Sequence, residues 1–127
     1  MSVLEGAQRK LAAIATEVYP NTIASGRLFL PDDERDWQSV AADGEVFIRI
    51  RPPQLVDSGL MNTFAAYVDV CHTRYRDARH NADLLVAYLL AANARSPKTS
   101  IKPTVVTIEG DGYWVMNVRF VLKVKTP

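Results

Sequence analysis

The end of the chain constrains the fold most, because apolar and other residues alternate there over twelve positions. One set consists of large apolar residues: Trp114, Met116, Val118, Phe120, Leu122 and Val124. The residues between them are mostly polar: Val115, Asn117, Arg119, Val121, Lys123 and Lys125. Successive side chains of a β-strand point to opposite faces, so this pattern predicts a long strand with one buried face. The turn sequence at 109–112, EGDG, joins it to a strand at 104–109 and predicts a C-terminal hairpin.

Two segments have helical periodicity. Over 3–18 apolar residues recur every three or four positions, with Ser2 as the expected cap and Glu5 three residues after it. A second helix is expected from a cap at Asp77 to about Asn93.

Two further strands are expected in the middle of the chain. Residues 45–51 alternate, with Arg49 and Arg51 on one face, until Pro52 and Pro53 stop the ladder. Residues 63–74 are rich in aromatic and β-branched residues and predict a central strand. The expected fold is one α+β domain over 1–127: a mixed, mainly antiparallel sheet of four to five strands with two helices packed on it, closing on the hairpin. The segments of about 20–44 and 52–62 are expected to be irregular.

Composition limits the class of protein. With 127 residues, 48% of them hydrophobic and 23% charged, the chain fits one globular domain. A single cysteine, Cys71, excludes an internal disulfide. The longest apolar run, 84–92, is too short to span a bilayer, so no membrane association is expected, and the N-terminus does not resemble a secretion signal.

Charge is distributed unevenly along the chain. Residues 1–71 contain ten acidic and six basic residues and 72–127 contain four and nine, so the two parts carry −4 and +5. Two interpretations remain open: the charges mix on the folded surface, or an acidic side of one copy meets a basic side of another. The overall charge of +1 does not indicate a nucleic-acid binder.

No pattern of catalytic residues is present, and we expect no enzymatic activity, cofactor or metal. The six glycines form no phosphate-binding loop, and no serine lies in a nucleophile elbow. Cys71 and His72 are adjacent in a strand and point to opposite faces, which disfavours a shared metal. Cys71 is expected to fill the sheet interior, with a reactive thiol as the alternative. Asp69 is the best candidate for a polar group in a pocket, and a satisfied buried carboxylate explains it equally well.

Candidates for an interface are side chains of a type unusual for their position, and clusters of basic residues. Trp37 is a large apolar residue in a polar loop. The cations around the start of the second helix oppose its dipole and favour an anionic partner or, alternatively, are scattered surface charge. With the basic residues of the strands, the candidates are Trp37, Arg49, Arg51, Arg74, Arg76, Arg79, Arg119, Lys123 and Lys125.

The order of these elements resembles that of tail terminator and tail completion proteins of long-tailed bacteriophages. Four stretches carry the resemblance: VLEGAQRKLAAIATEVYP, GEVFIRIRPP, YVDVCHTRYRDARHNADLLVAYLLAA and VTIEGDGYWVMNVRFVLKVK. The likeness lies in layout and covers most of the chain except 22–43. That family has no diagnostic motif, so no functional residue is transferred.

The resemblance implies a structural virion protein located at the tail–neck junction and assembled in the host cytoplasm. It implies a homo-oligomeric ring, commonly a hexamer, that caps the tail tube protein and joins it to a head-side connector or neck protein, with DNA only passing through the lumen. The alternatives are another head–tail joining or minor tail protein, and a small ligand-binding or enzymatic α+β domain.

Overall fold

The computed structural model describes residues 2–35, 44–59, 61–95 and 103–125, except the side chains of 93–95. In chain order the elements are α1 (Val3–Val18), α2 (Pro20–Ala24), β1 (Leu28–Phe29), β2 (Phe47–Ile50), β3 (Gln54–Asp57), β4 (Met61–His72), α4 (Tyr75–Arg95), β5 (Thr104–Glu109) and β6 (Trp114–Lys125). The described residues form an α+β fold with a mixed sheet of six strands and three helices, and the sheet is not closed. The expected fold class is confirmed, and the additional elements are short.

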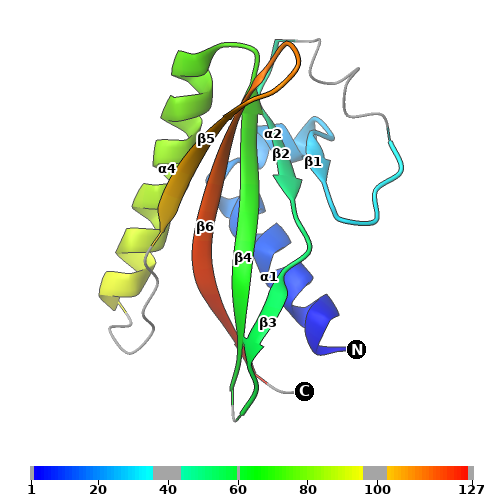
Figure 1. The fold of residues 1–127 in the computed structure, drawn as a ribbon, viewed down its shortest axis with the longest axis vertical. Helices are drawn as coiled ribbons and strands as arrows, with labels where there is room; N and C mark the ends of the chain where they lie inside the picture. The colour runs from blue at the N-terminus through cyan, green and yellow to red at the C-terminus, as the bar shows by residue number, and fades with distance from the viewer. Residues whose placement is uncertain (1, 36–43, 60, 96–102, 126–127) are drawn as a thin grey trace.

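The sheet is built around β4. Its strand order is β1-β2-β4-β6-β5, with β3 also paired to β4 (Figure 1). β6 runs antiparallel to β4 along its whole length, from Met61 opposite Lys125 to His72 opposite Trp114. On its other side β4 pairs with β2 near one end and with β3 near the other. The central strand and the C-terminal hairpin predicted from the sequence are therefore confirmed, and among the described strands only β1 and β2 pair in parallel.

Both long helices cover the same face of the sheet, and the main core lies between the two layers (Figure 1). α1 and α4 both contact β4 and β6. The long helices contribute Ala7, Leu11, Ala15, Ala78, Ala82, Leu85 and Leu89, and Tyr19 joins them from between α1 and α2. The long strands contribute Phe64, Ala66, Val68, Val70, Met116, Val118, Phe120 and Leu122. Burying a leucine in this layer contributes about 1.5–3 kcal/mol. The alternation that predicted a buried face in β6 thus identifies the side that contacts the helices.

The helix starts differ in how well the sequence predicted them. The Ser2 side chain accepts a hydrogen bond from the Glu5 backbone N–H over 3.1 Å, as expected for an N-cap. The predicted cap at Asp77 is wrong, because α4 begins at Tyr75 and Asp77 lies in its first turn. There Asp77 pairs with Arg74 Nε over 2.7 Å, a favourable position for a carboxylate at a helix N-terminus.

The two segments expected to be irregular contain short regular elements. The first holds α2 and β1, and its residues 36–43 lie outside the described part of the chain. The second holds β3, and β4 already begins at Met61. Pro52 and Pro53 do end the β2 ladder, but β4 extends beyond β2 and offers a second stretch of edge to β3. The break between β2 and β3 is therefore a short interruption on one side of β4.

Candidate binding surface

The sheet face opposite the helices carries most of the polar strand residues. Side chains of β2, β4 and β6 that point away from the main core belong to it, and at one end it is closed by a second apolar cluster of Phe29, Phe47, Cys71 and Val115, with Tyr113 packed against it. Cys71 is fully buried there, which confirms that it fills the sheet interior. Burial raises the pKa of the Cys71 thiol, so the group is neutral near pH 7.

Asp69 of β4 lies at the centre of this face and is fully buried. Its direct neighbours in the sheet are Arg49 of β2 and Asn117 of β6. Asp69 Oδ2 accepts hydrogen bonds from Arg49 Nη2 at 3.0 Å and Arg51 Nε at 2.7 Å, and Oδ1 accepts one from Asn117 Nδ2 at 2.7 Å. The sequence left open whether Asp69 is a pocket group or a satisfied carboxylate, and the structure shows a satisfied one.

The network continues to Arg119, whose Nε donates to Asn117 Oδ1 over 2.7 Å. The Arg119 guanidinium carbon also lies 5.8 Å from the centre of the Tyr67 ring. Among these residues, three arginines face one carboxylate, so the network carries a net charge of +2. Burial alone lowers the pKa of Arg49, but the negative groups around it, Asp69 among them, more than offset this and the pKa is raised.

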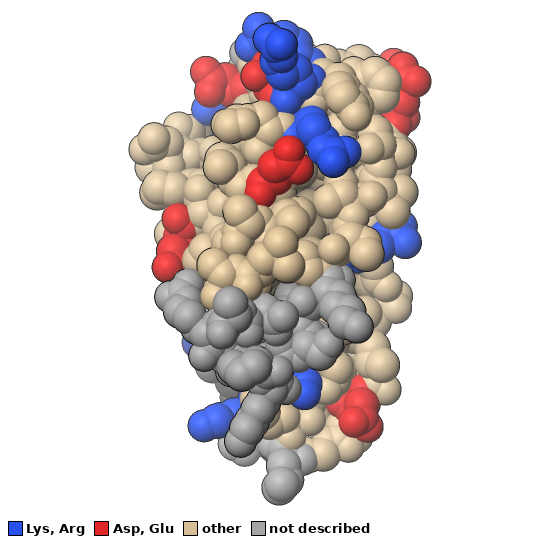
Figure 2. Space-filling model, turned by 90° about the vertical axis from the view of Figure 1, so that its left-hand side faces the viewer, with Lys and Arg blue, Asp and Glu red and all other residues tan. Residues whose placement is uncertain are grey.

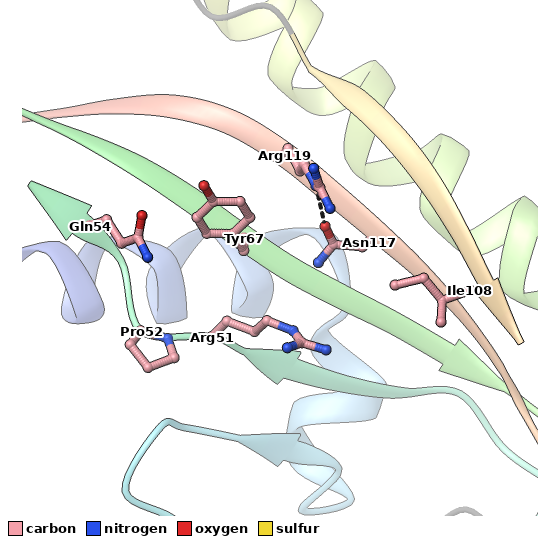
Figure 3. Close-up of a pocket in the computed structure, with 7 residues that line it drawn as sticks. All are labelled: Arg51, Pro52, Gln54, Tyr67, Ile108, Asn117 and Arg119. Carbon is pink, nitrogen blue, oxygen red and sulfur yellow. Dashed lines mark hydrogen bonds between the residues drawn. The ribbon is translucent and has the colours of Figure 1, made fainter. Parts of the chain in front are cut away.

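An open cavity of about 360 Å³ lies over the network (Figure 3). Its lining residues come from four strands and the segment between β2 and β3: Arg51, Pro52, Gln54, Tyr67, Ile108, Asn117 and Arg119. Figure 3 shows the Arg51 and Arg119 side chains approaching Asn117 from opposite sides. The cavity thus combines two cations, two amides and a phenol with apolar walls, which suits recognition of a polar anionic group.

The structure brings some of the predicted interface residues together and separates others. Arg49, Arg51 and Arg119 belong to the network just described. Lys123 and Lys125 continue along β6 toward its far end. Trp37 lies outside the described residues.

The arginines at the start of α4 form a separate group. Arg74 and Arg79 are exposed and pair with Asp77 and Asp83, and Arg76 is exposed as well. Two of these three cations thus have carboxylate partners within α4, so the unfavourable helix-dipole placement is locally compensated.

Of the cavity's polar lining residues, Gln54, Tyr67 and Asn117 were not among the interface candidates predicted from the sequence. The only available signal was parity, since Tyr67, Asp69 and Cys71 alternate on one face of β4 and Asn117 and Arg119 on one face of β6. Register decides which of these meet, and register depends on pairing between distant segments.

His72 lies at the end of β4 in a different hollow, of about 220 Å³, which it shares with Glu45, Arg74, Asp77 and other residues. Its Nδ1 accepts a hydrogen bond from the Arg74 backbone N–H over 3.0 Å, so Nδ1 carries no proton. Burial lowers the pKa of His72, although Asp77 opposes this. Among the described residues, no three His, Cys, Asp or Glu side chains group closely enough to hold a metal ion.

Exposed large apolar side chains occur on elements at both margins of the sheet. We call the first the β5 side; its residues are Tyr75, Leu84 and Leu90 of α4 and Val106 and Ile108 of β5. Val106 and Ile108 lie opposite Asn117 and Val115 in the sheet, so their side chains point to the open sheet face. Figure 2 looks at this side: charged groups gather at its upper end, and the described surface around its middle is mostly uncharged. We call the second the β3 side; its residues belong to α1, β3, the start of β4 and the segment after β1 and are Leu4, Leu30, Leu55, Val56 and Met61.

These two sides lie at opposite margins of the sheet (Figure 1). Within the described residues, the outer edges of β5 and β3 pair with no further strand. Unpaired strand edges with exposed apolar side chains are the surfaces by which sheets join other chains.

Comparison with known proteins gives no assignment. No family model matches the chain, and no curated protein matches it. None of the described helices is long and apolar enough to cross a membrane.

Proposed function

We propose that this chain is a structural protein that assembles head to tail into a ring, and that the ring is a phage tail terminator. The observation that carries the proposal is the pair of different apolar sides at opposite margins of one sheet. A contact between two different patches is heterologous, and repetition of it closes a ring when the rotation per copy allows closure. The layout shared with tail terminators supports the specific role.

Under this proposal the β5 side of one copy contacts the β3 side of the next. Val106 and Ile108 are 37% and 40% exposed on β5, while Leu55 and Val56 are 55% and 67% exposed on β3. Burying these residues removes apolar area from water, which favours association. The ring, a hexamer in the proposed role, caps the tail tube protein and presents its other surface to a head-side connector, without catalysis.

The assembly test uses one charged substitution on each side. Val106→Lys and Val56→Lys each place a cation in one apolar patch at a site exposed enough to leave the fold intact. We expect native mass spectrometry to show rings for the wild type and monomers for each variant. Ala13→Lys, at an exposed position of α1, is the matched control and keeps the ring.

A mixture of the two variants distinguishes a heterologous contact from a symmetric one. Each variant retains one intact side, so one joint forms between unlike variants and the mixture yields heterodimers. A symmetric contact through one side alone leaves the other variant fully assembled. A wild type that stays monomeric at high concentration, alone and with the tube protein, contradicts the ring.

The terminator role has its own test, because other head–tail joining and minor tail proteins also form rings. Genes for a tail tube and a tape measure beside the coding gene are expected, and a metabolic operon there contradicts the role. With the tube protein from that genome, the wild type should bind tube ends in electron micrographs and stop their growth. The Val56→Lys variant, which cannot close a ring, should leave tube length unlimited.

A small ligand-binding domain remains the second candidate, favoured by the cavity between Arg51 and Arg119. It predicts a monomer that binds a small anion, and the measurements above and below separate the two functions.

A further inference from the structure

The guanidinium groups of Arg51 and Arg119 are only partly used inside the molecule. Arg51 donates from Nε to Asp69, and Arg119 donates from Nε to Asn117. Within the part of the chain that the structure describes, the terminal Nη groups of both residues make no hydrogen bond. Both side chains line the same cavity, so their remaining donors are available to a ligand there (Figure 3).

Charge in the cavity is unbalanced. Its lining contains two arginines and no carboxylate. Asp69 lies beneath and is shared by Arg49 and Arg51, so it does not neutralise the set. An arginine that is fixed through Nε keeps its outer N–H groups in a defined plane, which lowers the ordering cost of binding a planar anion.

The remaining lining indicates what the anion is attached to. Pro52, Ile108 and the Tyr67 ring offer apolar contact, and Gln54 offers an amide for a polar chain. An aliphatic stem that ends in a carboxylate fits this combination, since guanidinium groups bind carboxylates in a bidentate way. A nucleic-acid strand instead requires a basic groove that follows successive phosphates with bases stacked along it, and the lining offers two cations and one aromatic ring.

We infer that Arg51 and Arg119 form a binding site for an acidic side chain, a glutamate or aspartate, of a partner protein segment. Asn117 and Asp69 are positioning residues that hold the two guanidinium groups. The residues of the site all belong to one copy, but Ile108 also belongs to the β5 side, so the ring contact borders the cavity.

The test uses the whole chain with Val56→Lys as background, so that assembly through the β3 side does not cover the cavity. The probe is a short blocked peptide with alternating glycine and glutamate, titrated while the Arg Nε–Hε signals are followed by NMR. We expect the Arg51 and Arg119 signals to shift, and the matching glycine–glutamine peptide to bind at least about tenfold more weakly, as expected when a charge-assisted hydrogen bond is lost.

Variants localise the effect. Arg51→Gln and Arg119→Gln should each weaken peptide binding about tenfold, and Arg119→Lys should weaken it less because the charge remains. Arg79→Gln removes an exposed arginine of α4, outside the cavity, and should leave peptide binding unchanged. Unfolding midpoints in urea verify that each variant is folded.

The sources of the anion are separated in parallel titrations. Glutarate that binds as tightly as the peptide, or inorganic phosphate or single-stranded DNA that binds more tightly, overturns the inference in favour of another ligand. Equal binding of the glutamine peptide, or binding that Arg51→Gln and Arg119→Gln do not change, also overturns it. None of these outcomes bears on the ring, which is measured without the Val56→Lys background.

Discussion

The half-exposed Arg51 donates a hydrogen bond from Nε to the fully buried carboxylate of Asp69, over 2.7 Å. Arg49 adds a second cation to this face. Burying these charges costs free energy unless each of them is paired. The carboxylate accepts hydrogen bonds from Arg49, Arg51 and Asn117, and these replace the hydrogen bonds to water that it loses on burial. This arrangement decides how the face responds to substitution.

Asp69→Asn removes the only negative charge of the network and leaves Arg49 partly buried without a counter-charge. We expect the free energy of unfolding to fall by about 2 kcal/mol, less than for a fully buried pair because both arginines reach solvent. Urea denaturation at pH 7 measures this. Asp83→Asn removes the carboxylate of the exposed pair with Arg79 and is expected to cost less than about 1 kcal/mol. An equal loss in both variants contradicts the special role of Asp69.

His72 makes stability depend on pH. Its pKa in the folded protein lies below the reference value of 6.5, because burial disfavours the charged form. The unfolded chain therefore binds a proton first as the pH falls. The stability from this residue is complete above about pH 6.5 and is lost as the pH falls toward the folded-state pKa.

The check compares urea midpoints at pH 7.5 and 5.5. His72→Asn retains an acceptor for the Arg74 N–H but does not titrate, so it should show a smaller drop than the wild type. His80→Asn removes the exposed histidine of α4 and serves as the control. If wild type and His72→Asn lose the same stability, the histidine does not contribute to the pH dependence.

Cys71 is predicted to be an unreactive thiol. It is fully buried in the cluster with Phe47 and Val115, and its raised pKa leaves little thiolate. Labelling with a thiol-specific disulfide reagent at pH 8 should proceed at least about a hundredfold more slowly in the native protein than in urea, because the site must first open. Rapid labelling of the folded protein supports the alternative of a reactive thiol instead.

Gly112 occupies a backbone conformation that other residues avoid, with φ of +80° in the hairpin between β5 and β6. No atom lies within 4 Å of a Cβ built there, so Gly112→Ala costs only backbone strain, about 1 kcal/mol. Gly59→Ala is the control, because Gly59 has no positive φ and the nearest atom to its added Cβ is 3.9 Å away. In thermal unfolding, Gly112→Ala should have a lower Tm than both Gly59→Ala and the wild type.

Local patterns predicted the long elements well. The periodicity over α1 reflects its buried face, and the alternation over β6 reflects the face that packs on the helices. The other face of β6 is also buried at Val115 and Asn117, which the alternation alone did not predict. The start of α4 was misplaced because Asp77 matches an N-cap preference, whereas Tyr75 starts the helix and the carboxylate contributes from within the first turn. β3 was missed because Pro52 and Pro53 signal a break locally and only the length of β4 shows that pairing resumes.

The candidate site depended on information that local patterns do not hold. The sequence identified Arg49, Arg51 and Arg119 as basic strand residues and Asp69 as a polar residue in a strand. Their convergence requires that Arg49 and Asn117 both lie opposite Asp69 in the sheet. Such register is fixed by pairing between segments about 20 and 48 residues apart, as the hydrogen bonds of Asp69 show.

The polar face of β6 provides the final prediction about assembly. Arg119 is exposed and Lys123 is partly exposed on the face that carries Asp69. If acidic side chains of a neighbouring copy contact this face in the proposed ring, Arg119→Glu combined with Lys123→Glu reverses two charges and repels them. We expect light scattering to show loss of the ring at physiological salt while the urea midpoint changes little.

The pair Arg119→Gln and Lys123→Gln removes the charges without reversing them and should weaken assembly less. Normal assembly of the Glu variant means that this face is solvated in the ring, and that the apolar β5 and β3 sides alone hold the copies together.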